Sequence, residues 1–82
     1  MGNDEIIALL QESLNLQEIK VTGEGGHYQI IAIDDSFDAM SRVKRQQFVY
    51  RPLSDLISEG TIHAVSIKTF TTAQWERDKL FN

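Results

Sequence analysis

The spacing of apolar residues changes repeatedly along this chain between the period of a strand and the period of a helix. Strand-like alternation occurs in residues 18–22, 28–33 and 62–70. Helical spacing occurs in residues 3–15, 41–50, 52–59 and 72–80. This order, α-β-β-α-α-β-α, predicts an α+β fold in which one three-stranded sheet has helices packed on one face.

Five residues mark where the predicted helices begin and end. Asn3 is the expected N-cap of the first helix. Pro52 cannot lie inside a helix, because it lacks the N–H group and clashes with the preceding turn, so we expect it at the first position of the third helix. Gly60 is expected to end that helix in a left-handed conformation. Thr71 and Gln74 have the spacing of a capping box for the last helix.

A glycine-rich segment, residues 23–26, separates the first two predicted strands. Two strands joined by a short loop that contains glycine are typical of a β-hairpin. His27 stands at the exit of this loop, and we expect the glycines to leave it free to move. A phosphate-binding loop is not expected here, because such loops lead from a strand into a helix.

The chain of 82 residues contains no cysteine, and 41% of its residues are hydrophobic. This composition is close to the globular average and predicts one domain, residues 1–82. The lack of cysteine excludes disulfides, thiolate catalysis and metal sites made of cysteine alone. No apolar run is long enough to span a membrane, and the acidic first residues do not match a secretory signal. We therefore expect a cytoplasmic protein that functions through its surface.

Positive charge is concentrated in one short segment of an otherwise acidic chain. Residues 41–54 contain four of the eight Lys and Arg residues and no acid, although the whole chain has a net charge of −4. The four are Arg42, Lys44, Arg45 and Arg51. Such a cluster is typical either of a solvated helix face or of a docking surface for nucleic acid or an acidic partner, to which Lys68 would add. Because DNA affinity comes mainly from phosphate neutralisation, this cluster predicts weak DNA binding at physiological salt.

Two segments resemble the BolA family, and in particular its short bacterial IbaG-like members. The first is residues 37–50, FDAMSRVKRQQFVY, and the second is residues 62–68, IHAVSIK. A Thr-capped helix follows, and we expect its Trp75 to pack against the sheet. The resemblance covers nearly the whole chain and implies a BolA-like fold, which is similar to a type II KH domain.

The chain departs from the family pattern at two places. Ala39 stands where the family usually has glycine, and Arg45 is followed by Gln46 and Gln47 where the family often has histidine and arginine. The one Gly-x-x-Gly spacing, residues 23–26, joins two predicted strands and is not a backbone clamp of the KH type. These departures weaken the inference of nucleic-acid binding more than the inference of the fold.

The resemblance gives a role to the two histidines of the chain. Taken alone, a single histidine is more often a structural residue. In the family, however, His63 corresponds to a ligand of an iron–sulfur cluster, and His27 lies in the loop that carries a second ligand, either Cys or His. The resemblance therefore implies a 2Fe–2S cluster shared with a monothiol glutaredoxin, which would supply its own cysteine and a bound glutathione thiolate.

Two ligands are too few to hold a cluster or a tetrahedral zinc ion alone. We therefore expect a chain that is a monomer by itself, binds no cofactor alone, and forms a heterodimer with the glutaredoxin. The implied function is an accessory role in cluster assembly, trafficking or iron-linked regulation, including stress responses. The alternative is a nucleic-acid-binding transcriptional regulator that uses the basic helix.

An enzymatic function is not expected. A catalytic serine would need a histidine within hydrogen-bond reach and a supporting acid. Ser66 and His63 are three residues apart on a predicted strand, which places them on opposite faces. The adjacent Asp34 and Asp35 are typical of a turn.

Overall fold

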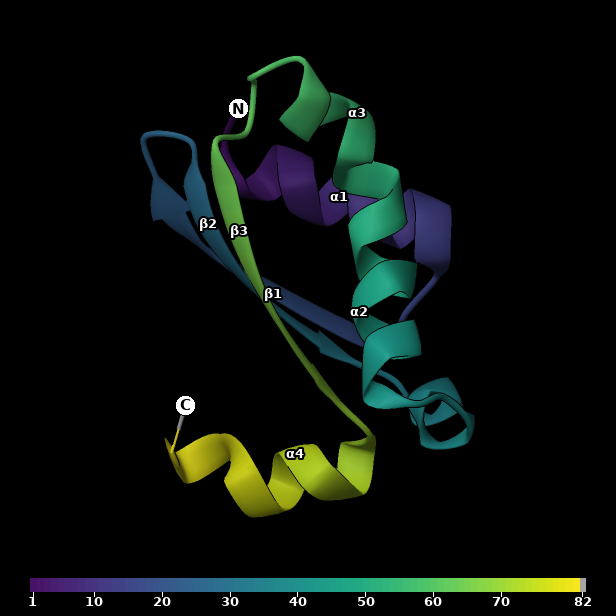
Figure 1. Ribbon diagram of the computed structural model, residues 1–82. Coiled ribbons are helices and arrows are strands. Elements are labelled where there is room, and N and C mark those ends of the chain that lie inside the picture. Colours follow the sequence, from purple (N-terminus) through teal and green to yellow (C-terminus); the bar gives the residue numbers. More distant parts are fainter. Residues whose placement is uncertain (82) are drawn as a thin grey trace.

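The computed structural model describes residues 1–81 and contains one sheet, four α-helices and three short 3-10 helices within that range (Figure 1). The helices and strands are α1 (Asn3–Leu14), β1 (Glu18–Glu24), β2 (His27–Ile33), α2 (Arg42–Tyr50), α3 (Ser54–Ser58), β3 (Ala64–Phe70) and α4 (Thr72–Asp78). The 3-10 helices are η1 (Asp35–Ala39), η2 (Arg51–Leu53) and η3 (Lys79–Phe81). The predicted α+β fold and its element order are confirmed.

The three strands lie in the order β1-β2-β3, with β2 in the centre. β1 and β2 are antiparallel, whereas β2 and β3 are parallel. A parallel pair needs a crossover connection, and the segment from η1 to α3 provides it. Figure 1 shows α1, α2 and α3 together on one side of the sheet, while α4 lies apart from them beyond the carboxyl end of β3.

The hydrophobic core lies between the sheet and these three helices. Its largest fully buried side chains are Phe37, Ile6, Leu10, Ile30, Ile33, Leu53, Ile62 and Val49. The apolar spacing of the first helix therefore predicted its buried face, since Ile6 and Leu10 have no exposed surface. No helix within residues 1–81 combines the length and the apolar character needed to cross a membrane.

Most of the expected helix signals are confirmed. Gly60 has a φ of 83° after α3. Pro52 was expected at the first position of the third helix, but it lies in η2, and α3 begins at Ser54. The capping box of α4 is complete: the Thr71 hydroxyl accepts from Gln74 N at 3.2 Å, and Gln74 Oε1 accepts from Thr71 N at 2.9 Å. Trp75 packs against Phe70 at the end of β3, with the ring centroids 5.2 Å apart.

The expected N-cap of the first helix is wrong. Asn3 is the first helical residue, and Gly2 is the N-cap. The Glu5 carboxylate accepts a hydrogen bond from Gly2 N at 3.0 Å, so a side chain one turn inside the helix satisfies the free N–H group.

Several expected boundaries also differ from the structure. β1 continues through Gly23 and Glu24, which leaves a hairpin loop of Gly25 and Gly26. The third strand begins at Ala64 and not at residue 62, and α4 ends at Asp78, before η3.

The Asp34 carboxylate stabilises the connection between β2 and η1. It accepts hydrogen bonds from Gln17 N at 3.0 Å, from Ser36 N at 3.0 Å and from the Ser36 hydroxyl at 2.5 Å. Partial burial raises the pKa of Asp34, but these hydrogen bonds outweigh it and hold the pKa below its ordinary value of 3.8. The ionised form therefore stabilises the fold at neutral pH, and this contribution is lost as the pH falls through the lowered pKa.

We expect Asp34→Asn to lower the melting temperature at pH 7 and to reduce the further loss of stability below about pH 4. Thermal unfolding followed by circular dichroism between pH 7 and pH 2 measures both effects. Asp38→Asn is the matched control, because the Asp38 side chain in η1 is exposed and has no hydrogen-bond partner within residues 1–81. Parallel pH curves for Asp34→Asn and the unmodified protein would contradict the assignment.

Candidate functional site

The two histidines of the chain meet at one end of the sheet. His27 is the first residue of β2, and His63 directly precedes β3. The parallel register pairs His27 with Ala64, which brings the neighbouring His63 close to it. The ring centroids are 6.0 Å apart with an angle of 35° between the planes, and both residues are exposed. Two residues 36 positions apart in the sequence thus form one exposed pair.

Gly26 holds the His63 segment against the hairpin. Its carbonyl oxygen accepts hydrogen bonds from His63 N at 2.8 Å and from Ala64 N at 3.1 Å. Gly26 has a φ of 82°, and a Cβ atom at this position would overlap the His63 ring, lying 3.2 Å from Cγ and 3.3 Å from Nε2 and closer still to Cδ2. The ring therefore occupies the space that a side chain at residue 26 would need.

This contact changes the interpretation of the glycine-rich loop. The sequence suggested that the glycines leave His27 free to move, but His27 belongs to β2 and is paired on both sides, with Glu24 and Ala64. Gly26 instead makes room for His63. The two adjacent glycines before His27 were the only local sign of a close contact in this loop. The sequence did not indicate His63 as the contacting residue, because it lies far along the chain.

The histidine pair has the spacing of two ligands that share one metal ion. Metal–nitrogen bonds of about 2 Å place two imidazole rings on one ion with their centroids about 5–6 Å apart. No group of three or more His, Cys, Asp or Glu residues that could hold a metal occurs within residues 1–81. The pair can supply two ligands of a metal centre, which is fewer than a tetrahedral site needs.

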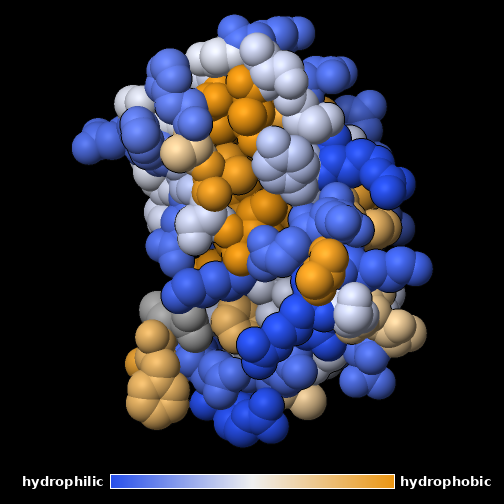
Figure 2. Space-filling view, viewed as in Figure 1, coloured by the Kyte–Doolittle hydropathy of each residue, from blue (hydrophilic) through white to orange (hydrophobic). Residues whose placement is uncertain are grey.

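An apolar strip adjoins the histidine pair. Figure 2 shows it on the face where β3 runs beside α3 and α2. Partly buried hydrophobic residues of β3 and α3 are Val65, Ile67, Leu56 and Ile57. Val65 follows His63 by two residues, and Val65 lines a shallow cavity together with His27. An apolar surface next to two exposed ligands suits contact with a protein partner.

The structure divides the basic residues of segment 41–54 between two cavities. Arg42 and Arg45 line one cavity together with Lys68 of β3. Lys44 and Arg51 line another, on the other side of α2. The sequence already indicated this division, because residues three or seven apart on a helix share a face whereas residues two apart do not. Arg77 of α4, which the sequence interpretation did not single out, lies at the first cavity.

Arg45 is held in place by the surrounding structure. Its Nε donates to the carbonyl oxygen of Phe37 at 2.8 Å, and its Nη1 donates to Gln74 Oε1 at 3.1 Å. The guanidinium carbon also lies 6.0 Å from the centroid of the Phe37 ring. Arg45 therefore connects η1, α2 and the first turn of α4.

Comparison with known proteins identifies the family of this chain. The family model described as BolA-like protein matches residues 4–74. The chain belongs to the BolA family. A curated BolA relative, the acid stress protein IbaG of Escherichia coli strain K12, is 52% identical over 82 residues, which cover 100% of this chain and 98% of the relative.

Solved structures of BolA proteins have the same fold. The BolA domain of SufE1 from Arabidopsis thaliana has a TM-score of 0.73 and 30% identity, and the match covers 89% of this chain and 96% of that domain. A bol-like protein from Babesia bovis has a TM-score of 0.78 at 22% identity, covering 96% and 94% of the two chains. The second likeness supports the fold alone.

Proposed function

We propose that this BolA family chain pairs with a monothiol glutaredoxin and that His27 and His63 ligate a 2Fe–2S cluster bridging the two proteins. The observation that carries the proposal is the exposed histidine pair, with ring centroids 6.0 Å apart. The role is an accessory one in cluster assembly, trafficking or iron-linked regulation. The chain acts by binding in the cytoplasm and catalyses no reaction.

The chemistry of the pair supports this partner. Neutral imidazole is a good ligand for iron, and two histidines on one iron raise the reduction potential of a 2Fe–2S cluster relative to four thiolates. The remaining ligands are the cysteine of the glutaredoxin and the thiolate of its bound glutathione. The apolar strip that begins at Val65 supplies a contact surface beside the cluster.

Histidine ligation also couples the complex to acidity. A ligand must be deprotonated, so the heterodimer weakens as the pH falls. The Escherichia coli relative is named an acid stress protein. We propose that this chain likewise acts in a stress response, with release of the partner in acid as the physical link.

Titration of the full chain into cluster-loaded monothiol glutaredoxin tests the proposal. Visible absorption and circular dichroism report the cluster environment. We expect a spectral change that saturates at a one-to-one ratio at neutral pH and reverses on acidification. An unchanged visible spectrum, with the two proteins eluting separately in gel filtration, would overturn the proposed partnership.

A further inference from the structure

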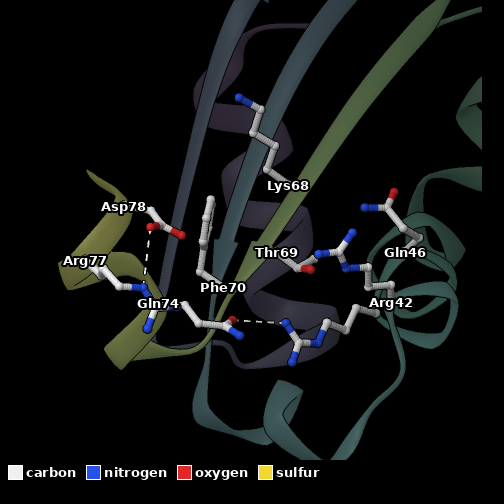
Figure 3. Close-up of a pocket in the computed structure, with 9 residues that line it drawn as sticks. Arg42, Gln46, Lys68, Thr69, Phe70, Gln74, Arg77 and Asp78 are labelled. Carbon is white, nitrogen blue, oxygen red and sulfur yellow. Dashed lines mark hydrogen bonds and ion pairs between the residues drawn. The ribbon is translucent and has the colours of Figure 1, made fainter. Parts of the chain in front are cut away.

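A cavity of about 460 Å³ lies between α2, β3 and α4, away from the histidine pair (Figure 3). Figure 3 shows Arg42 at one side, Arg77 and Asp78 on α4 at the other, and Lys68 and Phe70 of β3 between them. Phe70 ends β3, whereas His63 precedes its first residue. At about 3.3 Å per strand residue, the two sites are roughly 20 Å apart.

The cavity is positive although the chain is acidic. Its lining includes the cationic side chains of Arg42, Arg45, Lys68 and Arg77 and the carboxylate of Asp78. Asp78 lies 3.6 Å from Arg77 Nε, and within residues 1–81 the three arginines of the lining outnumber this one carboxylate. The cations come from three separate elements, so they meet through the fold and not through a run of basic sequence. Converging charges of one sign in a recess strengthen the local potential.

The two arginines contributed by α2 have different surroundings. The Arg45 guanidinium is occupied by the Phe37 carbonyl and by Gln74. Arg42 is exposed, and no hydrogen bond or ion pair joins its guanidinium to another residue in the range 1–81. Arg45 thus positions α4 against α2, while Arg42 retains a full set of donors directed to the cavity.

The shape and chemistry of the cavity fit a small phosphorylated molecule. Guanidinium groups bind phosphate oxygens through paired, charge-assisted hydrogen bonds. The volume is within the range of small-molecule sites, about 300–1,000 Å³. Phe70 adds an aromatic ring to the lining, and the Trp75 ring packs against it with the ring centroids 5.2 Å apart. A ligand with both a phosphate and a flat ring satisfies the charge and the aromatic surface together.

We propose that this cavity binds a nucleoside monophosphate, with Arg42 on the phosphate and Phe70 against the base. A nucleic-acid strand fits less well, because strand binding requires a continuous basic groove. Here Lys44 and Arg51 lie at the other cavity, across α2.

Calorimetric and NMR titration of the full chain with AMP, adenosine and inorganic phosphate at low salt tests this site. We expect AMP to bind at one-to-one ratio with amide shifts at β3, α2 and α4, phosphate to bind more weakly, and adenosine not to bind. Arg42→Ala should weaken AMP binding by at least about tenfold, since it removes a charge-assisted contact. Lys44→Ala, the same charge change on the same helix, should alter it by less than about twofold.

Three results would overturn the proposal. One is no saturable binding of AMP or phosphate. Another is an equal loss of affinity in Arg42→Ala and Lys44→Ala, which would indicate unspecific charge attraction. The third is tight, salt-sensitive binding of a single-stranded oligonucleotide that depends on Lys44 and Arg51, which would indicate a nucleic-acid surface. His63→Ala should leave AMP binding unchanged, so this site and the cluster proposal can fail independently.

Discussion

His63→Ala is expected to abolish the spectral change that the chain produces in cluster-loaded glutaredoxin. Loss of a residue that merely orients a metal ligand costs roughly 10–100-fold in affinity, so loss of the ligand itself should cost at least the upper value. The fold should survive, because His63 is exposed and its structural hydrogen bond to Gly26 comes from the backbone N–H group. Visible circular dichroism of the mixture measures the ligand role, and thermal unfolding of the chain alone measures the fold.

Substitutions at His27 provide the matched controls for this prediction. His27→Ala should remove the spectral change as well, because both rings belong to one exposed pair. His27→Cys should retain binding, since thiolate is also an iron ligand, and should lower the reduction potential of the bridging cluster. If the spectrum of the complex is the same with His63→Ala, His27→Ala and the unmodified chain, the histidines are not ligands.

Gly26→Ala is expected to weaken the cluster-bridged complex by at least about tenfold while leaving both histidines in the sequence, because ligand sets tolerate displacements of only about 0.5 Å. A Cβ atom on Gly26 needs the space of the His63 ring, and since that ring is exposed, it can swing away at little cost to folding. Titration of this variant into cluster-loaded glutaredoxin, followed by circular dichroism, measures the loss.

Gly25→Ala separates this effect from backbone strain. Gly25 has a φ of 64° and Gly26 has a φ of 82°, so alanine at either position costs about 1–2 kcal/mol in the left-handed region. A Cβ on Gly25 meets nothing within 4 Å, however, whereas one on Gly26 meets His63. We expect similar losses of thermal stability in the two variants and loss of the complex only in Gly26→Ala. Equal affinities of the two variants for the loaded partner would show that Gly26 does not position His63.

The histidine pair and the basic cavity lie at opposite ends of β3. His63 comes just before this strand and Phe70 ends it. Binding of a phosphorylated ligand at Phe70 therefore leaves the histidine pair and the adjoining apolar strip accessible to a protein partner. The two sites can be tested on the same preparation, because each has its own variants and its own readout.

Local sequence patterns were sufficient for most of the secondary structure. Apolar alternation indicated all three strands, and helical spacing indicated the buried face of α1, because both periods follow directly from backbone geometry. The capping box at Thr71 and the left-handed Gly60 were likewise local features. The predicted start of the third strand was wrong because contacts with distant residues, and not the local alternation, set the backbone there. Residues 62 and 63 continue the strand alternation in sequence, yet Ile62 is buried in the core and His63 is bonded to Gly26.

By itself the sequence determined the fold class, the lack of thiolate chemistry and the concentration of positive charge in one helix. It also carried the family resemblance through residues 37–50 and 62–68. Only the tertiary structure decided which side chains meet. The parallel register of β2 and β3 brought His27 close to His63. The packing of α4 placed Arg77 at the same cavity as Arg42, whereas Lys44 lines another cavity. The physical reason is that periodicity sets the direction of a side chain within its own element, whereas contacts between elements depend on how buried surfaces pack.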